Sequence, residues 1–205
     1  MSKPSTLTPR QRRHKKTKRA ILNTARQLVE EKGLDGFSLR EIARRIDYSP
    51  AGLYEYFDSK EEIIKAVRRE GETRLSITFQ QIPADLSYSE KLAEISLAYT
   101  RFAVENPQQF LLVFNTEPSS RRSLAEPVGE ASPYQILLDT VQAALDSGEV
   151  ACAGQYAAES IAFSLWSFMH GRAMLQLTFL RHFDGDFDTL QRWAIQTFLK
   201  GMQAK

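Results

Sequence analysis

Residues 38–64, SLREIARRIDYSPAGLYEYFDSKEEII, contain two short helical patterns separated by a tight turn. Ser38 followed three residues later by Glu41 is a capping-box pattern, and Ser49-Pro50 is a second helix-start signal. Two short helices joined by three or four residues are the arrangement of a helix-turn-helix, whose second helix enters the major groove of DNA. Apolar residues at helical spacing give each helix a buried face: Leu39, Ile42, Ala43 and Ile46 in the first, Leu53 and Phe57 in the second.

The sequence on both sides of this segment also has helical periodicity. Upstream, apolar residues repeat from Ile21 to Val29, and Gly33 is typical of a helix C-terminus. Downstream, Ser59 with Glu62 is another capping-box pattern. Further helices are expected from Ser59 to Pro83, from Ser89 to Val104, and over residues 108–114, 133–148, 155–181 and 187–202, with an exposed loop over 116–132. No stretch alternates as a strand does, so we expect an all-α fold.

Charge divides the chain into a basic head and an acidic body. The net charge is +2, but residues 1–60 hold 14 Lys and Arg against 7 Asp and Glu, whereas the remainder holds 13 against 18. A basic head indicates contact with a polyanion, although a solvated basic tail would give the same composition. We expect a disordered basic tail over residues 1–14, a three-helix DNA-binding domain over 15–60 and a larger helical C-terminal domain over 61–205.

The composition is that of a globular protein, with 42% hydrophobic and 25% charged residues. Its single cysteine, Cys152, excludes an internal disulfide and fits a reducing compartment. The N-terminus has no apolar stretch of the kind found in signal peptides, and the most apolar region, 157–180, contains charged residues. Because a membrane span needs about 20 apolar residues, we expect a cytoplasmic protein with no membrane partner.

Residues 38–64 resemble the helix-turn-helix signature of the TetR family of bacterial transcriptional repressors. The matching positions are Ile42-Ala43, Leu53-Tyr54, Tyr56-Phe57 and Ser59-Lys60-Glu61, and the resemblance extends upstream over residues 17–33. The family usually has Gly where this chain has Asp47, and often has His where it has Tyr56. Asp can adopt the left-handed conformation of the turn, and Tyr can donate a hydrogen bond to phosphate.

The resemblance implies which residues contact DNA. The phosphate-contacting positions would be Ser38, Tyr54, Tyr56 and Lys60, and the groove-facing positions Arg40, Ser49, Pro50, Ala51 and Gly52. Small residues at the start of the second helix let its backbone approach DNA, and the free N–H groups there favour phosphate. Other interpretations stay open: Tyr54 could be partly core, Lys60 only a helix-start residue, and Arg44 and Arg45 merely solvated.

The expected helix over residues 155–181 is apolar nearly all round, so it needs packing partners on two sides. The resemblance implies a homodimer in which the last two helices of each chain form a four-helix bundle. Trp166-x-x-x-His170-Gly171 also resembles the Trp-His-Gly type of TetR C-terminal domain, which binds an effector and dimerises. We expect the dimer interface to contain Leu165, Phe168, Leu190, Ala194 and Phe198.

Aromatic residues are concentrated in the C-terminal domain and could line a pocket for a small lipophilic or aromatic effector. Each of them could equally be an ordinary core residue, and His170 a core histidine. The candidates are Tyr99, Phe102, Phe110, Phe114, Tyr134, Phe163, Trp166 and His170. The chain has three histidines and one cysteine, without the spacing of metal ligands, so we expect neither a metal nor another cofactor.

The sequence therefore predicts a homodimeric TetR-type repressor that leaves a double-stranded DNA operator when a small molecule binds. An activator built on the same domain stays open. So do a non-specific architectural DNA-binding protein that uses the basic tail, and a small helical enzyme. The enzyme is disfavoured because the sequence has no Gly-x-Ser-x-Gly elbow, no phosphate-binding loop and no strand–turn–helix context for a dinucleotide site.

Overall fold

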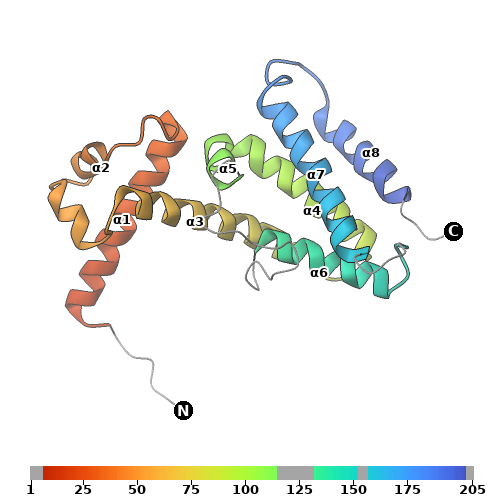
Figure 1. Cartoon of the computed structure of the whole chain (residues 1–205), viewed down its shortest axis with the longest axis horizontal. Helices are drawn as coiled ribbons and strands as arrows, with labels where there is room; N and C mark the ends of the chain where they lie inside the picture. The colour runs from red at the N-terminus through yellow and green to blue at the C-terminus, as the bar shows by residue number, and fades with distance from the viewer. Residues whose placement is uncertain (1–6, 115–131, 152–156, 202–205) are drawn as a thin grey trace, which may run out of the picture.

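The computed structural model describes residues 7–114, 132–151 and 157–201, and every regular element within these ranges is helical. Helix α1 (Pro9–Lys32), α2 (Leu39–Arg45) and the 3-10 helix η1 (Ala51–Glu55) form a head, and α3 (Lys60–Gln80) runs from the head into a body (Figure 1). The body contains α4 (Tyr88–Glu105), α5 (Pro107–Phe114), α6 (Pro133–Asp146), α7 (Ala157–Leu177) and α8 (Phe187–Lys200). The all-α prediction is confirmed. In the described ranges no helix is both long and apolar enough to cross a membrane.

Helix α1 begins earlier than the sequence prediction placed it. Residues 1–14 were expected to form a disordered tail, but the helix starts at Pro9, so residues 9–14 belong to it. The Thr8 side chain accepts a hydrogen bond from Gln11 N, and the Gln11 side chain accepts one from Thr8 N, which completes a capping box. This start signal is concealed by the basic composition around it. Residues 1–6 of the expected tail, and 116–131 of the expected loop, lie outside the described residues.

Two other helix starts are capped differently from the prediction. Helix α4 begins at Tyr88 because Ser87 and Glu90 form its capping box, where Ser89 was expected to be the cap. The capping box expected at the start of α2 is absent, because Ser38 makes no side-chain cap hydrogen bond. The carboxylate expected to complete that box instead binds two arginines farther along α2. Ser59 does cap α3, as expected, by accepting from Glu62 N.

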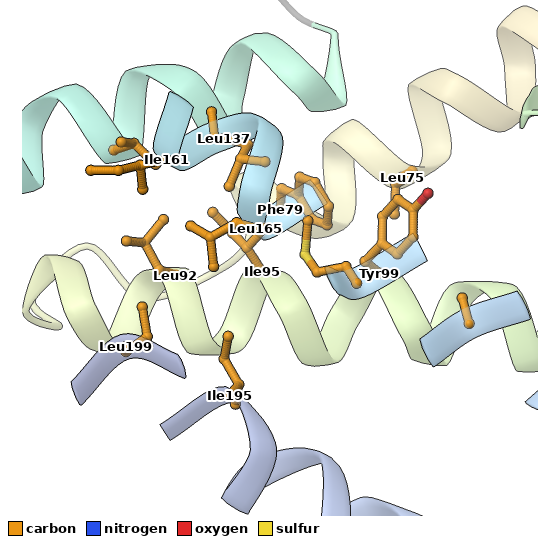
Figure 2. Close-up of a cluster of buried hydrophobic side chains, with 14 of the residues drawn as sticks. Leu75, Phe79, Leu92, Ile95, Tyr99, Leu137, Ile161, Leu165, Ile195 and Leu199 are labelled. Carbon is orange, nitrogen blue, oxygen red and sulfur yellow. The ribbon is translucent and has the colours of Figure 1, made fainter. Parts of the chain in front are cut away.

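The head and the body each have a hydrophobic core, and α3 contributes to both. Ile63 and Val67 of α3 are buried in the head core, whereas Leu75 and Phe79 are buried in the body core. Figure 2 shows the body core, in which side chains from α3, α6, α7 and α8 surround those of α4. The predicted division after residue 60 therefore lies at the start of a continuous helix, and it stays a prediction.

Helix α5 approaches the backbone of α3 closely at Gly71. A Cβ atom added there would lie 2.9 Å from Val113 Cγ2 and 3.0 Å from Gln109 Cγ. Both of these side chains are buried, so neither can swing into solvent to make room. Glycine is therefore required at this point of α3 by the packing of α5.

Gly71→Ala should lower the stability of the protein even though alanine favours a helix by about 1 kcal/mol over glycine. Overpacking of a buried contact costs about 1–3 kcal/mol, and for a chain of this size each kcal/mol corresponds to about 2–4 °C in Tm. Thermal unfolding followed by circular dichroism measures the change. Adding Val113→Ala to the Gly71→Ala protein should cost less than it does in the wild type, since it removes the clashing methyl. A Gly71→Ala protein as stable as the wild type would contradict this packing constraint.

Candidate functional site

The turn between α2 and η1 has the geometry expected of a helix-turn-helix. Asp47 has φ 54°, and in the described part of the chain it is the only residue other than glycine with positive φ. Tyr48 N donates to Ala43 O at 2.8 Å, and this bond closes the end of α2 over the left-handed residue. The expectation that Asp47 replaces the usual glycine in this conformation is confirmed.

The element after the turn is a 3-10 helix of five residues, where the sequence predicted a short helix with Pro50 as its first residue. Pro50 precedes η1, and Ser49 Oγ accepts a hydrogen bond from Gly52 N at 3.0 Å. Ala51 is exposed, whereas Gly52 is half-buried. A Cβ atom at Gly52 would lie 3.0 Å from Tyr48 Cδ1 and 3.1 Å from Ser49 Oγ. Ala51 is therefore an open position at the start of η1, whereas Gly52 packs against Tyr48 and Ser49.

Four other residues predicted to contact DNA have side chains that are exposed or half-buried. The Arg40 side chain is exposed, and so is that of Tyr54, at 55% of its full area, which excludes a core role for Tyr54. Ser38 is half-buried at the start of α2 and makes no cap hydrogen bond there. Lys60 Nζ lies 5.5 Å from the centroid of the Phe37 ring at the start of α3. These positions are available to a ligand, and their assignment to DNA contact stays a prediction.

A cluster of side chains beside η1 includes three residues that the sequence analysis did not select, Tyr48, His14 and Lys18. The hydroxyls of Tyr48 and Tyr56 lie 3.0 Å apart, and this bond is the main cause that raises the pKa of Tyr48. The His14 ring lies 4.7 Å from that of Tyr56, and Lys18 Nζ lies 4.6 Å from the centroid of the Phe57 ring. His14 and Lys18 continue the apolar stripe of α1 toward its N-terminus at helical spacing, which is the signal that could have identified them.

Arg44 and Arg45 form ion pairs. The alternative interpretation that they are merely solvated is therefore wrong. Arg44 binds Glu41 at 2.8 Å, and Arg45 binds Glu41 at 3.0 Å and Glu31 of α1 at 2.7 Å. Hydrogen bonds from Arg44 and Arg45 lower the pKa of Glu41 to about 2. Arg45 thus connects α2 to α1 within the head, whereas Arg44 is paired within α2.

In the body, six of the eight residues predicted to line a pocket form one aromatic cluster. The Phe110 and His170 rings stack at 5.5 Å, and the Tyr134 and Trp166 rings lie 5.1 Å apart. The hydroxyl of Tyr99 lies 2.9 Å from His170 Nδ1 and accepts a hydrogen bond from Trp166 Nε1 at 3.3 Å. The members of this cluster are Tyr99, Phe110, Phe114, Tyr134, Trp166 and His170.

The other two pocket candidates lie elsewhere. Phe163 points outward on α7 with 52% of its side chain exposed, so its assignment to the pocket is wrong. Phe102 is buried and lines a separate groove of about 290 Å³ between α3 and α4, where the Arg74 guanidinium lies 5.9 Å from its ring centroid. The helical period could not exclude Phe163, because the sequence of α7 is apolar on nearly every face.

Polar groups in the aromatic cluster are neutral and in part unpaired. Burial lowers the pKa of His170 and raises those of Tyr99 and Tyr134. The Tyr134 hydroxyl is buried and has no hydrogen-bond partner among the described residues. If the Tyr99 O–H donates to His170 Nδ1, the neutral imidazole carries its proton on Nε2. The cluster can therefore offer hydrogen bonds inside an apolar wall.

The predicted dimer residues divide between the core and the surface. Leu165 is only 1% exposed in the core of its own chain, so its assignment to the interface is wrong. Phe168 and Phe198 are half-buried and stack on one another at 5.0 Å, and Ala194 is half-buried. Leu190 and the neighbouring Trp193 are 62% and 72% exposed on α8. Together with Phe163 and Leu175 on α7, they leave large apolar side chains in solvent on the last two helices.

Comparison with known proteins agrees with this architecture. The chain is 22% identical to YobS of Bacillus subtilis (strain 168), an HTH-type transcriptional regulator, over 192 residues that cover 91% of this chain and 92% of YobS. A solved structure from Rhodococcus sp. RHA1 superimposes with a TM-score of 0.76 at 22% identity, and covers 91% of this chain and 95% of its own. RolR, solved with its ligand resorcinol, has a TM-score of 0.61 at 15% identity, over 95% of this chain and 91% of RolR.

Two family models together match most of the chain. The model of bacterial regulatory proteins of the tetR family matches residues 21–67, which contain the helix-turn-helix. The model of the tetracyclin repressor-like C-terminal domain matches residues 92–198, which is more than half of the chain. Both the family and the relatives indicate a regulator and not an enzyme. This chain belongs to the TetR family and is a DNA-binding transcriptional regulator.

Proposed function

We propose that this protein is a dimeric repressor that binds an operator through η1 and releases it when a small aromatic molecule binds the body. The observation that carries the DNA-binding step is the open start of η1, where Ala51 is exposed beside a fixed turn. Small side chains there allow the backbone to approach base edges and phosphates closely. Arg40 and Tyr54 flank this surface with exposed polar groups that can position the duplex.

Dimerisation follows from the apolar side chains left on the last two helices. Trp193 and Leu190 on α8 and Phe163 and Leu175 on α7 are about half exposed or more. Soluble monomers seldom expose so many large apolar side chains on two helices, and a twofold interface would bury them against a second copy. Two heads held by one dimer would read two half-sites of an operator.

The aromatic cluster is the proposed effector site. Its rings suit an aromatic ligand, and the neutral His170 and the unpaired Tyr134 hydroxyl suit hydroxyl groups on that ligand. RolR, which shares this fold, is solved with resorcinol, a small aromatic diol. We therefore propose a hydroxylated aromatic compound as the effector class.

Helix α5 is the proposed connection from this site to the head. Phe110 and Phe114 of α5 belong to the aromatic cluster, whereas Leu112 is buried in the head core. On the same helix Gln109 accepts a hydrogen bond from Arg74 of α3 at 2.6 Å. A ligand that separates the rings would displace α5 and with it α3, provided that it binds better to the displaced state.

Ala51→Glu should abolish operator binding while leaving the fold intact. The added carboxylate would meet the groove wall and its phosphates, and it replaces an exposed side chain that makes no core contact. The operator is first selected from a random-sequence duplex library, and binding is measured by fluorescence anisotropy. Ala51→Gln is the matched control for size, and it should retain more affinity than Ala51→Glu.

The selection step also separates the repressor from an architectural protein. A non-specific binder would enrich no sequence from the library. An Ala51→Glu protein that keeps wild-type affinity and circular dichroism would show that η1 does not face the DNA.

Trp193→Glu should convert the dimer into a monomer, because it would bury an unpaired charge in the proposed interface. Light scattering at micromolar concentration measures the mass. Trp193 is a better site for this test than Phe198, since Phe198 stacks on Phe168 of its own chain. Arg181→Glu, at an exposed position outside the proposed interface, is the control and should leave the dimer unchanged. A dimeric Trp193→Glu protein would place the interface elsewhere.

Resorcinol and related phenols should change the fluorescence of Trp166 and weaken operator binding over the same concentration range. The chain has two tryptophans, so the titration uses Trp193→Phe to leave Trp166 as the only reporter. Coupling of about 1–3 kcal/mol would weaken operator binding by about 5- to 150-fold. Compounds that bind and quench Trp166 without changing operator affinity would contradict the proposed release mechanism.

A further inference from the structure

The first half of α1 is a strongly basic helix that extends beyond the rest of the head. Residues 10–19 include seven Lys and Arg and no acidic residue. Residues 9–16 are helical and all exposed. Figure 1 shows this part of α1 reaching past α2 and η1, on the side away from the body. Lys18 is the first residue of α1 whose side chain lies over a ring of the head core, that of Phe57. At about 1.5 Å per residue, the helix from Pro9 to Lys18 is about 13 Å long.

This charge pattern is unfavourable for a helix on its own. Cations three and four positions apart repel each other, as Arg12 does with Lys15 and Lys16. The first turn contains no acidic residue to interact with the positive end of the helix dipole. Among the described residues none of the seven cations forms an ion pair. The segment therefore carries a concentration of positive charge for which the described residues supply no counterion.

Contacts along α1 fix which side of this segment adjoins the recognition element. His14 lies against Tyr56, and Thr17 lies beside the hydroxyl of Tyr48, the residue just before Ser49. Arg13 and Arg10 precede Thr17 by four and seven residues, so at about 100° per residue they share its side of the helix. Arg12 and Lys15 lie on roughly the opposite side.

We propose that α1 is a folded extension of the DNA-binding surface, in which Arg10 and Arg13 contact the phosphate backbone beside the base pairs that η1 reads. The inference rests on the proposed operator binding. DNA is favoured as the polyanion because the same side of α1 carries the contacts with Tyr48 and Tyr56, which flank the groove-facing residues. Because the segment is helical and anchored to the head, only the cations on one face of the helix can contact DNA. In a disordered tail, every cation could contact DNA equally.

Two double variants test this dependence with equal loss of charge. Arg10→Gln/Arg13→Gln removes two cations from the side of Tyr48, and Arg12→Gln/Lys15→Gln removes two with the same spacing from the other side. Glutamine is a good helix former, and circular dichroism checks that α1 stays helical. Affinity for the selected operator is measured over a range of salt concentrations.

The first variant should reduce the slope of log K against log salt by about 3.6, because each subunit of the dimer loses two phosphate contacts and each contact contributes about 0.9. The second should change the slope much less. Equal reductions in both variants would show a diffuse electrostatic effect and overturn the assignment, as would no reduction in either. Failure of the wild-type protein to select any operator would contradict the proposed function itself, whereas a selected operator with equal slopes contradicts only the assignment of α1.

Discussion

Phe110 and Leu112 are two residues apart on α5, yet they are buried in different hydrophobic cores. An eight-residue helix is too short to be stable alone, so its position is set by what it packs against on both sides. The close contact at Gly71 adds a steric limit, since α3 has no side chain there to absorb a shift of α5. The head core is consequently completed by Leu112 of α5, a helix that the sequence analysis assigned to the C-terminal domain.

This shared helix determines how the two halves of the chain can influence each other. A flexible linker would let the head rotate without any change in the body. Here the head core loses the packing of Leu112 if α5 moves, and α3 loses the hydrogen bond between Arg74 and Gln109. Packed interfaces of this kind change between discrete arrangements, since side chains that interdigitate do not slide continuously. The packing of α5 thus couples the position of the head core to that of the body core.

The sequence predicted those parts of the structure that depend on local chemistry. The turn at Asp47, the cap at Ser59 and the positions of most helices follow from capping residues and helical period. Prediction failed at the start of α4, where Ser87 and Ser89 are two candidate caps and only Ser87 has a carboxylate, Glu90, three residues on. It also failed on α7, because an all-round apolar helix does not reveal that Leu165 faces the core and Phe163 the solvent. Such assignments depend on tertiary packing, which the periodicity of one helix does not contain.

The cations of the head show why composition alone could not locate the DNA-binding residues. Arg44 and Arg45 lie nearest in sequence to the turn, but Glu41 and Glu31 neutralise them, and the pair of Arg45 with Glu31 stabilises the contact between α1 and α2. The seven cations of residues 10–19 lie farther away in sequence, and no acidic side chain of the described chain neutralises them. An ion-paired arginine has little free charge to offer a phosphate, whereas an unpaired one on an exposed helix adds to the field that attracts DNA. The net positive charge of the head is therefore concentrated in α1. The helix η1 carries small and aromatic side chains, which suit a close approach to the groove.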